Sequence, residues 1–414
     1  MPKNKKTIVF YCATAPSVII YKIARILKAN HYKTILLTMC EKDRLNHFFY
    51  NQAFNRIIYS NFQFSKLNFK SLFYYIKNSL YLIKFLFLMM FLKTDILIGV
   101  AGNNWQLKLV HKYFFRKYPF IYFPYDILSH FFKSKKSAIS YGTPEFEVMA
   151  EKYCFDNCNG ILTKGNESEL DIIERRIHEK LDLKKPILYF LPYCSKEFVV
   201  PINKNKLSKI DKETHIVYVG SFPGDPNYIK TLLSIYKQLL DLKIHLHIYM
   251  FVDHIKKGEE NEYTKNFFNS ILKNKYFHLY KPLHPIKLIG EISKYDFGFW
   301  DSFYSKDYDK EDLENLSIIL GSGNKFASYL EAGLPIIYDH KSLVLDKLMK
   351  KYETGIPFDK NDLKDLYKKI NKSNYSKMEK NAVKAREELD IDKNFPRLEK
   401  FLKDVINYKL NNPQ

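Results

Sequence analysis

One stretch, residues 319–338 (ILGSGNKFASYLEAGLPIIY), constrains the fold of this chain more than any other. Gly321 and Gly323 permit unusual backbone dihedral angles, and they lead into Asn324, a residue type favoured at helix N-caps. Gly333 stands where a glycine commonly ends a helix, and the apolar run after it is typical of a strand buried on both faces of a parallel sheet. The stretch therefore predicts a helix, a turn and a strand.

The predicted helix, which begins at about Lys325, has two different sides. Apolar residues at helical spacing form the packing side: Phe326, Tyr329 and Leu330. Polar residues form a second stripe that is expected to bind: Asn324, Ser328 and Glu331. Backbone amides at the helix start, around Ser322 and Gly323, together with the helix dipole and Lys325, would form a seat for a diphosphate. The glycines alone are also explained by an ordinary helix cap and stop.

The string NKFASYLEAGLPII within this stretch resembles the Asn-Lys-x-x-x-Tyr-Leu-x-Ala-Gly-x-Pro segment of GT-B glycosyltransferases, particularly the retaining family 4 type. In that family the segment lines the donor site for a nucleotide sugar. The resemblance implies an α/β fold of two doubly wound Rossmann-like domains facing a central cleft. The chain departs from the family pattern where a Glu commonly holds the donor ribose, because Ser328 stands there, and Leu320 replaces a second Glu. We expect Glu331, on the same helical face, to substitute.

The order of predicted elements agrees with two domains. A strand at 7–11, a helix and a strand at 34–40 begin a parallel doubly wound sheet, and a strand at 215–220 restarts the same pattern. We divide the chain into an N-terminal acceptor-side domain, a polar Lys-rich linker, a C-terminal nucleotide-sugar-binding domain and a last helix near the hinge. The boundaries are 1–194, 195–213, 214–393 and 394–414.

The resemblance also implies functional residues in loops that follow strands. Gly220 and Ser221 would approach the donor phosphates, and Leu283 and His284 would hold the nucleobase. Asp126 follows a predicted strand at a place where the family has a residue that touches the sugar or the acceptor. Ordinary alternatives exist, because an Asp after a strand is commonly a helix cap and a lone His is commonly a capping or solvated side chain.

Composition limits the partners of the chain. The 414 residues include 66 basic and 45 acidic side chains, which gives a formal net charge of +21. No zinc-finger spacing, aromatic RNA-binding motif or Arg-rich recognition helix occurs, so the charge favours an anionic membrane surface over nucleic acid. Five scattered cysteines indicate a reducing compartment, and the pair Cys154 and Cys158 lacks a nearby His or second pair. We therefore predict no metal site.

The most apolar segment is 71–92, SLFYYIKNSLYLIKFLFLMMFL. Lys84 lies too near the middle of the only plausible span, so we predict that the segment does not cross a membrane. Two alternatives stay open: a helix packed against the N-terminal sheet, or a helix lying in the membrane interface with its lysines reaching water. The N-terminus lacks a signal-peptide pattern. We expect a cytoplasmic protein, peripheral on the inner face of the cell membrane.

The leading functional hypothesis is an enzyme. It transfers a sugar from a nucleotide diphosphate sugar, its donor substrate, to a membrane-associated or cell-envelope glycan or lipid acceptor, as in polysaccharide biosynthesis. No cofactor and no metal are expected, because Lys325 and the helix-start amides can stabilise the leaving diphosphate and no Asp-x-Asp motif occurs. Lys325 and Asp126 are the catalytic candidates. The alternatives are a sugar-nucleotide epimerase of the same architecture, or a catalytically degenerate membrane partner subunit.

Overall fold

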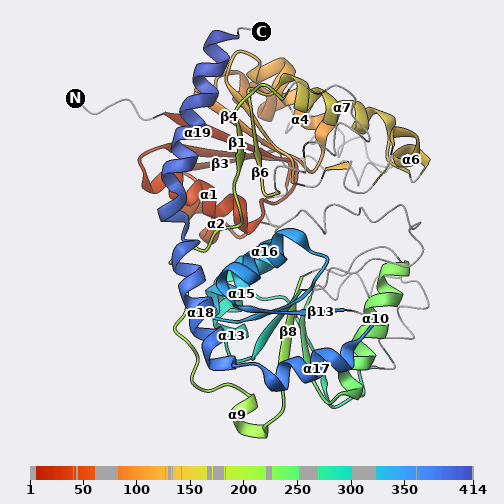
Figure 1. Cartoon of the computed structure of the whole chain (residues 1–414). Helices are drawn as coiled ribbons and strands as arrows, with labels where there is room; N and C mark the ends of the chain where they lie inside the picture. Colours follow the sequence, from red (N-terminus) through yellow and green to blue (C-terminus); the bar gives the residue numbers. More distant parts are fainter. Residues whose placement is uncertain are drawn as a thin grey trace. The chain divides into compact units, whose positions relative to one another are not determined.

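A computed structural model describes the fold of the chain. The structure describes residues 6–40, 42, 45–60, 83–125, 127–128, 132, 134–140, 142–165, 170, 181, 183–220, 226–250, 269, 271–300, 323–359 and 361–412. Contacts divide the chain into two compact units, which are residues 1–191 with 394–414, and residues 192–393. Each unit is built on one parallel sheet with helices on both faces (Figure 1).

The sheet of the first unit has the strand order β3-β2-β1-β4-β5-β6-β7, and all its neighbouring strands are parallel. Its strands are β1 (Thr7–Cys12), β2 (Lys33–Thr38), β3 (Arg56–Tyr59), β4 (Ile96–Val100), β5 (Phe120–Phe123), β6 (Gly160–Thr163) and β7 (Ile187–Tyr189). The order reverses direction between β1 and β4. This reversal is the switch point of a doubly wound fold, where ligands bind at the carboxyl ends of the strands.

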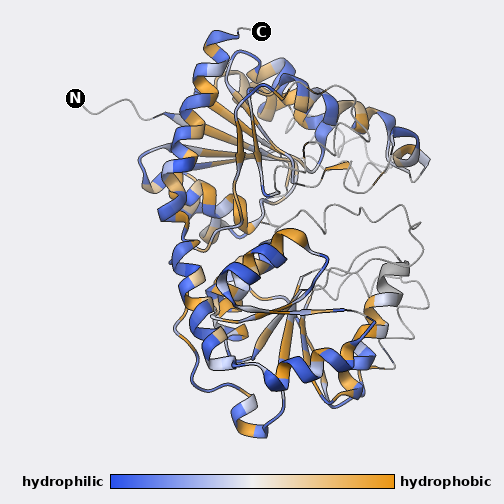
Figure 2. Ribbon diagram, viewed as in Figure 1, coloured by the Kyte–Doolittle hydropathy of each residue, from blue (hydrophilic) through white to orange (hydrophobic). Residues whose placement is uncertain are grey.

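Helices cover both faces of this first sheet. They are α1 (Val18–Ala29), α2 (His47–Ala53), α4 (Asn104–Val110), η3 (His111–Phe115), α6 (Lys135–Ser140), α7 (Glu145–Asn157) and the last helix, α19 (Ile391–Asn411). Gly160 in β6 permits α19 to pack closely, because a Cβ at that position would lie 2.4 Å from Val405. Strands of both sheets are mainly apolar, whereas most helices carry a polar side (Figure 2). Burial of the apolar sides forms the core of each unit.

The sheet of the second unit has the order β10-β9-β8-β11-β12-β13, again parallel throughout. Its strands are β8 (His215–Val219), β9 (His245–Tyr249), β10 (Phe277–Tyr280), β11 (Phe297–Trp300), β12 (Ile336–Asp339) and β13 (Gly355–Phe358). Counted within the unit, this is the order 3-2-1-4-5-6 of dinucleotide-binding folds, with the switch point between β8 and β11.

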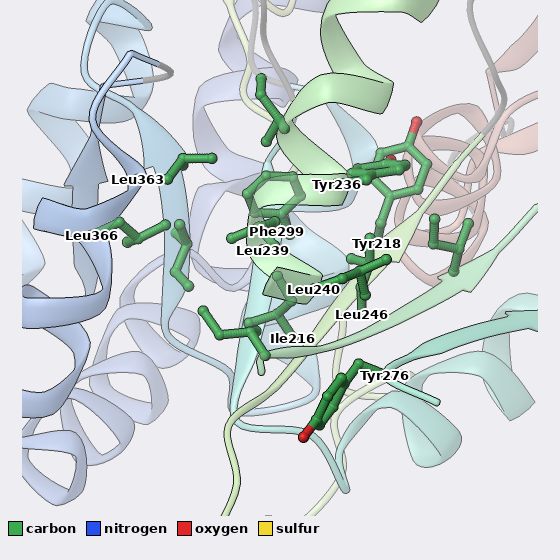
Figure 3. Close-up of a cluster of buried hydrophobic side chains, with 14 of the residues drawn as sticks. Ile216, Tyr218, Tyr236, Leu239, Leu240, Leu246, Tyr276, Phe299, Leu363 and Leu366 are labelled. Atoms are coloured by element: carbon green, nitrogen blue, oxygen red, sulfur yellow. The ribbon is translucent and has the colours of Figure 1, made fainter. Parts of the chain in front are cut away.

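The helices of the second unit cover the two faces of its sheet. They are α9 (Ser208–Asp211), α10 (Pro226–Asp241), α13 (Pro285–Ile292), α15 (Asn324–Glu331), α16 (Leu343–Tyr352), α17 (Leu363–Lys372) and α18 (Tyr375–Glu388). On one face, α10 and α17 bury their apolar residues against β8, β9 and β11 (Figure 3). Leu239 and Leu366, for example, point toward Ile216 and Phe299 in this cluster. Elsewhere in this unit α15 packs against β11, α16 packs against β12 and β13, and α13 and α18 contact α15.

The fold predicted from the sequence, α/β with two doubly wound parallel sheets, is confirmed. One element was not predicted from the sequence: β13 adds an edge strand beside β12. Segment 195–213, predicted as a linker, packs against the second unit. There the buried amine of Lys206 donates hydrogen bonds to the carbonyls of Ser293 and Tyr295, and α9 forms. The last helix, predicted near the hinge, belongs to the first unit from Asn394 onward.

Part of the apolar segment 71–92 lies outside the described residues, which resume at Ile83. Residues 83–90 are helical, and Phe85, Met89 and Leu92 are buried in the core of the first unit. In the part of the chain that the structure describes, no helix combines the length and apolar character that crossing a membrane requires.

Candidate nucleotide-sugar site

The carboxyl edge of the second sheet brings together residues from three separate segments. Gly220 directly follows β8, Leu283 and His284 follow β10, and α15 begins at Asn324 on the connection from β11 to β12. Because all strands of this sheet are parallel, these positions lie at one edge. The predicted site residues on strands far apart in the sequence are therefore assembled by the topology of the sheet.

Lys325 lies at the switch point of this edge. Its Nζ is 4.1 Å from the centroid of the Tyr218 ring in β8 and 5.8 Å from the centroid of the Trp300 ring in β11. A cation over an aromatic face is attracted by the ring quadrupole, so both strands of the switch point hold the amine. A Cβ at Gly220 would lie 3.0 Å from Cε of Lys325 and 3.0 Å from the hydroxyl of Tyr218. Glycine at position 220 therefore leaves room for the lysine.

The start of α15 is fixed by close packing. A Cβ at its N-cap residue, Gly323, would lie 2.9 Å from the Trp300 ring. Tyr329, further along the helix, is fully buried, and its hydroxyl donates to the carbonyl of Phe299 at 2.9 Å while it accepts from the backbone N–H of Val219 at 3.3 Å. These two bonds connect α15 to the ends of both switch-point strands. The helix start, which presents amides and a positive dipole, is thus held beside Lys325.

The two predicted sides of α15 behave differently. The packing side is confirmed, because Phe326, Tyr329 and Leu330 are completely buried. On the other stripe, Asn324 and Ser328 are half-buried, and the Ser328 hydroxyl donates to the carbonyl of Asn324 at 3.2 Å. Both side chains stay at the surface beside Lys325. Gly333 ends the helix with a φ of +72°, as predicted from the sequence.

Glu331 does not share that surface. Its side chain is 1% exposed, and one carboxylate oxygen accepts the backbone N–H of Ser195 at 2.8 Å. Its own carbonyl accepts from Arg386 at 3.0 Å and from the N–H of Val200 at 3.2 Å. These contacts tie the segment after β7 to α15, which argues against the ribose-binding role that the sequence suggested. The pattern of three polar residues on one helical face gave no signal that the last was buried.

The loop after β10 supplies the remaining described candidates. Leu283 is 39% exposed, and His284 is the N-cap residue of α13, although its side chain does not cap the helix. Burial, followed by the charge of Lys287, lowers the pKa of His284, which favours the neutral imidazole. An apolar side chain and a neutral ring next to each other can contact a nucleobase. Ser221, Ser322 and Asp126 lie outside the described residues.

The cysteines form no metal site among the described residues. All five thiols are free, and Cys154 and Cys158 are completely buried. The Sγ atom of Cys158 donates to the carbonyl of Phe155 at 3.3 Å, and burial raises the pKa of this thiol to about 11. Both residues therefore act as small buried side chains at the end of α7.

Solved structures that are similar over nearly the whole chain include the following three. A sucrose-phosphate synthase from Thermosynechococcus elongatus matches with a TM-score of 0.63 and 10% identity, over 96% of this chain and 99% of the synthase chain. HepE from Anabaena, in complex with UDP and glucose, matches with a TM-score of 0.59 and 10% identity over the same shares. A glycosyltransferase from Rickettsia africae matches with a TM-score of 0.54 and 14% identity, over 99% and 97%.

No protein-family model matches the sequence, and no curated protein matches it either. The structural likeness, at identities of 10 to 14%, therefore concerns the fold. That fold is the two-domain α/β architecture of GT-B glycosyltransferases that the sequence predicted.

Proposed function

We propose that this chain is a glycosyltransferase that moves a sugar from a nucleotide diphosphate sugar to an acceptor. The observation that carries the proposal is the position of Lys325 at the switch point of the second sheet, against Tyr218 and beside Gly220. Open α/β sheets bind their ligands there. Support also comes from HepE, a structure of the same fold that contains UDP and glucose.

The proposed chemistry uses electrostatic stabilisation. Breaking the bond between the sugar and the diphosphate places negative charge on the departing oxygen. Lys325 and the amides at the start of α15 would contact this charge as it develops. The positive end of the helix dipole would also stabilise it. The aromatic rings of Tyr218 and Trp300 restrict the amine before the donor binds, so less side-chain freedom is lost on binding. The proposed transfer requires no metal ion.

The nucleotide part of the donor would extend along the same edge of the sheet. We assign the phosphates to Gly220, Ser221, Ser322 and Gly323, the nucleobase to Leu283 and His284, and neighbouring polar contacts to Asn324 and Ser328. Glu331 is left out because it is buried against Ser195. Asp126 is proposed as a catalytic residue on the acceptor side.

Replacing Lys325 by Ala tests the proposal. Loss of one charge-assisted contact to the leaving group should lower kcat/KM for release of the nucleoside diphosphate by about a hundredfold, with an unchanged melting temperature. Lys364→Ala is the matched control, because this exposed lysine lies on α17 of the same unit. Equal turnover by both variants and the wild type would remove Lys325 from the mechanism.

The proposed acceptor is a glycan or lipid of the cell envelope, presented at the inner face of the membrane. Support comes from the helix at 83–90, whose second side is apolar and exposed. Ile83, Phe87, Met90 and Phe91 are 60%, 58%, 67% and 71% exposed. Lys84 and Lys93 flank them and are exposed as well. Apolar side chains next to lysines, in a chain of net charge +21, fit an anionic membrane surface.

Two alternatives give different results in the same assay. A sugar-nucleotide epimerase would interconvert donors without transferring the sugar to an acceptor. A degenerate partner subunit would bind a donor, seen as a thermal shift, but release no nucleoside diphosphate. The burial of Glu331 favours this second alternative, because the described part of the donor site then lacks the carboxylate that commonly holds the ribose.

A further inference from the structure

Four histidines gather on one face of the second sheet, far from the proposed donor site. His215 is in β8, His245 and His247 are in β9, and His278 is in β10. The strand register pairs His215 with His245 and His247 with His278. Because side chains alternate along a strand, all four rings lie on the face opposite the apolar cluster of Figure 3. We call them the histidine cluster.

Within the histidine cluster, His215 and His247 form a hydrogen-bonded pair that is linked to a carboxylate. Nε2 of His215 lies 2.9 Å from Oδ2 of Asp211, and Nδ1 of the same ring lies 2.9 Å from Nε2 of His247. Nδ1 of His247 in turn lies 3.3 Å from the hydroxyl of Tyr280. A carboxylate accepts only, so Asp211 places the proton of neutral His215 on Nε2. The lone pair of Nδ1 then points at His247.

The hydrogen-bonded pair of His245 and His278 repeats this arrangement. Nε2 of His245 lies 2.6 Å from Oε2 of Glu213, and Nδ1 of His245 lies 2.9 Å from Nε2 of His278. The two hydrogen-bonded pairs stack on each other. The ring of His215 stacks on that of His245, and the ring of His247 stacks on that of His278, each with centroids 4.3 Å apart. Two Nδ1 lone pairs, each fixed by a carboxylate, therefore lie next to each other.

Carboxylates that hold the outer nitrogen of a histidine are the usual partners of metal-binding imidazoles. They fix the tautomer and the ring orientation, and they make the inner nitrogen more basic. In the histidine cluster Asp211 and Glu213 take this position, and their side chains are 37% and 35% exposed. The cluster is therefore open to solvent at the amino ends of β8 and β9, while His215 and His247 are buried.

We propose that the histidine cluster binds one divalent transition-metal ion such as Zn²⁺, through ring nitrogens of His215, His245 and His247, with His278 as a fourth ligand. Ligand atoms of the first three all lie within 4.8 Å of one another. With a metal–nitrogen distance of about 2.05 Å, two nitrogens are about 2.9 Å apart at a right angle and about 3.3 Å apart in a tetrahedron. To hold the ion tetrahedrally, the 2.9 Å pairs must open slightly, and the stacked rings must rotate so that their nitrogens face one point.

The proton balance of binding is simple. In the metal-free chain Nε2 of His247 donates to Nδ1 of His215, so this nitrogen must lose its proton to bind the ion. Moving that proton to Nδ1 of the same ring leaves His247 neutral and lets it donate to the hydroxyl of Tyr280. His278 shifts its proton in the same way, from the Nε2 that donates to Nδ1 of His245 to its own Nδ1, whereas His215 and His245 bind through the Nδ1 lone pairs that they already have. Imidazole ligands of this kind suit Zn²⁺, Co²⁺, Ni²⁺ and Cu²⁺.

The metal would be structural and not catalytic. His215 is the first residue of β8, and Gly220 follows its last residue. At about 3.3 Å per residue, the backbone of these two positions is separated by about 16 Å along the strand. The ion would connect β8, β9 and α9, because Asp211 is the last residue of that short helix. The proposal is thus independent of the proposed donor site.

Metal titration of the full chain tests the proposal. After treatment with a chelator and its removal, wild-type protein should bind one equivalent of Co²⁺ with visible absorption of nitrogen-ligated cobalt, and Zn²⁺ should displace it and raise the melting temperature. His245→Asn and His278→Gln should each weaken Zn²⁺ binding at least tenfold. Asp211→Asn and Glu213→Gln should weaken Zn²⁺ binding tenfold to a hundredfold, because the imidazole rings would no longer be held in their orientation.

His31→Asn is the control, because this histidine is exposed in the other unit and its φ of +67° suits asparagine. It should bind Zn²⁺ like the wild type. Absence of stoichiometric binding by the wild type would overturn the proposal, as would unchanged affinity in the His245 and His278 variants. If those variants fail to fold, X-ray absorption of the wild-type zinc complex decides, since fewer than three imidazole ligands would contradict the assignment.

Discussion

At the scale of single residues, two glycines shape the candidate donor site by being small. A Cβ at Gly298 in β11 would lie 2.2 to 2.6 Å from ring atoms of Tyr329, so only glycine lets this tyrosine lie across the strand. A Cβ at Gly323 would meet the Trp300 ring at 2.9 Å. Neither Gly298 nor Gly323 has a positive φ. Their role is close packing between α15 and β11, which places the helix start beside Lys325.

Gly323→Ala should weaken donor binding while the chain stays folded. The added methyl group has to push the Trp300 ring or the first turn of α15 away, and either movement displaces the amides beside Lys325. We expect roughly a tenfold rise in Kd for a nucleoside diphosphate, on the order of 1.4 kcal/mol. Calorimetric titration measures it.

Gly290→Ala is the matched control for this substitution. Gly290 lies inside α13, and nothing is within 4 Å of a Cβ built there. Alanine should raise the stability of the unit by roughly 0.5–1 kcal/mol through its better helix propensity, without an effect on Kd. Equal Kd values for Gly323→Ala and the wild type would contradict the packing role assigned to Gly323.

At the scale of elements, the helix at 83–90 has one buried side and one exposed apolar side. Phe85 and Met89 pack in the core of the first unit, whereas Phe87 and Phe91 are exposed and contact each other with ring centroids 4.7 Å apart. Transfer of exposed neighbouring aromatic rings from water into the membrane interface lowers their free energy. The described part of the segment is thus packed in the core on one side, and its exposed side is the one that the proposed membrane binding would use.

The double substitution Phe87→Ser and Phe91→Ser should reduce sedimentation with anionic vesicles at low salt at least tenfold. It removes apolar area that would enter the interface and leaves the buried side of the helix unchanged. Tyr113→Ser is the control, because this aromatic residue of the same unit is 66% exposed and is distant in sequence from the helix. Release of wild-type protein at high salt is expected from screening. Wild-type protein that stays in the supernatant at low salt would refute membrane binding.

Elements with local sequence signals were predicted best. The bounds of α15, its packing side and its glycine stop follow from caps and spacing, and the structure agrees within one residue at its start. The strand β13 was missed because its four residues, GIPF, include a glycine and Pro357. Proline is tolerated there because β13 is the edge strand of its sheet. Only its pairing with β12 identifies it.

Long-range partners could not be predicted from local patterns. The burial of Glu331 depends on the N–H of Ser195, which lies 136 residues earlier. The histidine cluster depends on the register of β8, β9 and β10, which no spacing in the sequence specifies. The one local signal was the His-x-His alternation at 245 and 247, which places two imidazoles on one face of a strand.

At the scale of the whole molecule, the two units share one plan but differ in what the sheet carries. Both sheets reverse their strand order between the first and fourth strands, β1 and β4 in one unit and β8 and β11 in the other. Only the second sheet has both a lysine at its switch point and, at its amino ends, the histidine cluster. These statements concern the described residues. The second unit therefore has two candidate sites at opposite ends of the same strands.

The separation of these sites predicts how the protein responds to metal removal. Turnover of the donor should survive treatment with EDTA, because the leaving group would be stabilised by Lys325 and the helix-start amides. Loss of an ion from the histidine cluster should instead lower the melting temperature of the second unit, since a ligand that binds only the folded state stabilises it. Trp300 fluorescence reports on this unit, and Trp105 reports on the other.

The assay should be run at a temperature where circular dichroism shows that the metal-depleted chain is still folded. Metal analysis of the same sample confirms depletion, and Lys325→Ala supplies the rate expected when the leaving group loses its partner. Turnover that falls to that rate in EDTA and returns with Mg²⁺ or Mn²⁺ would contradict the metal-independent mechanism. A lower melting temperature with unchanged turnover would instead agree with a structural ion bound at the end of the sheet remote from the donor.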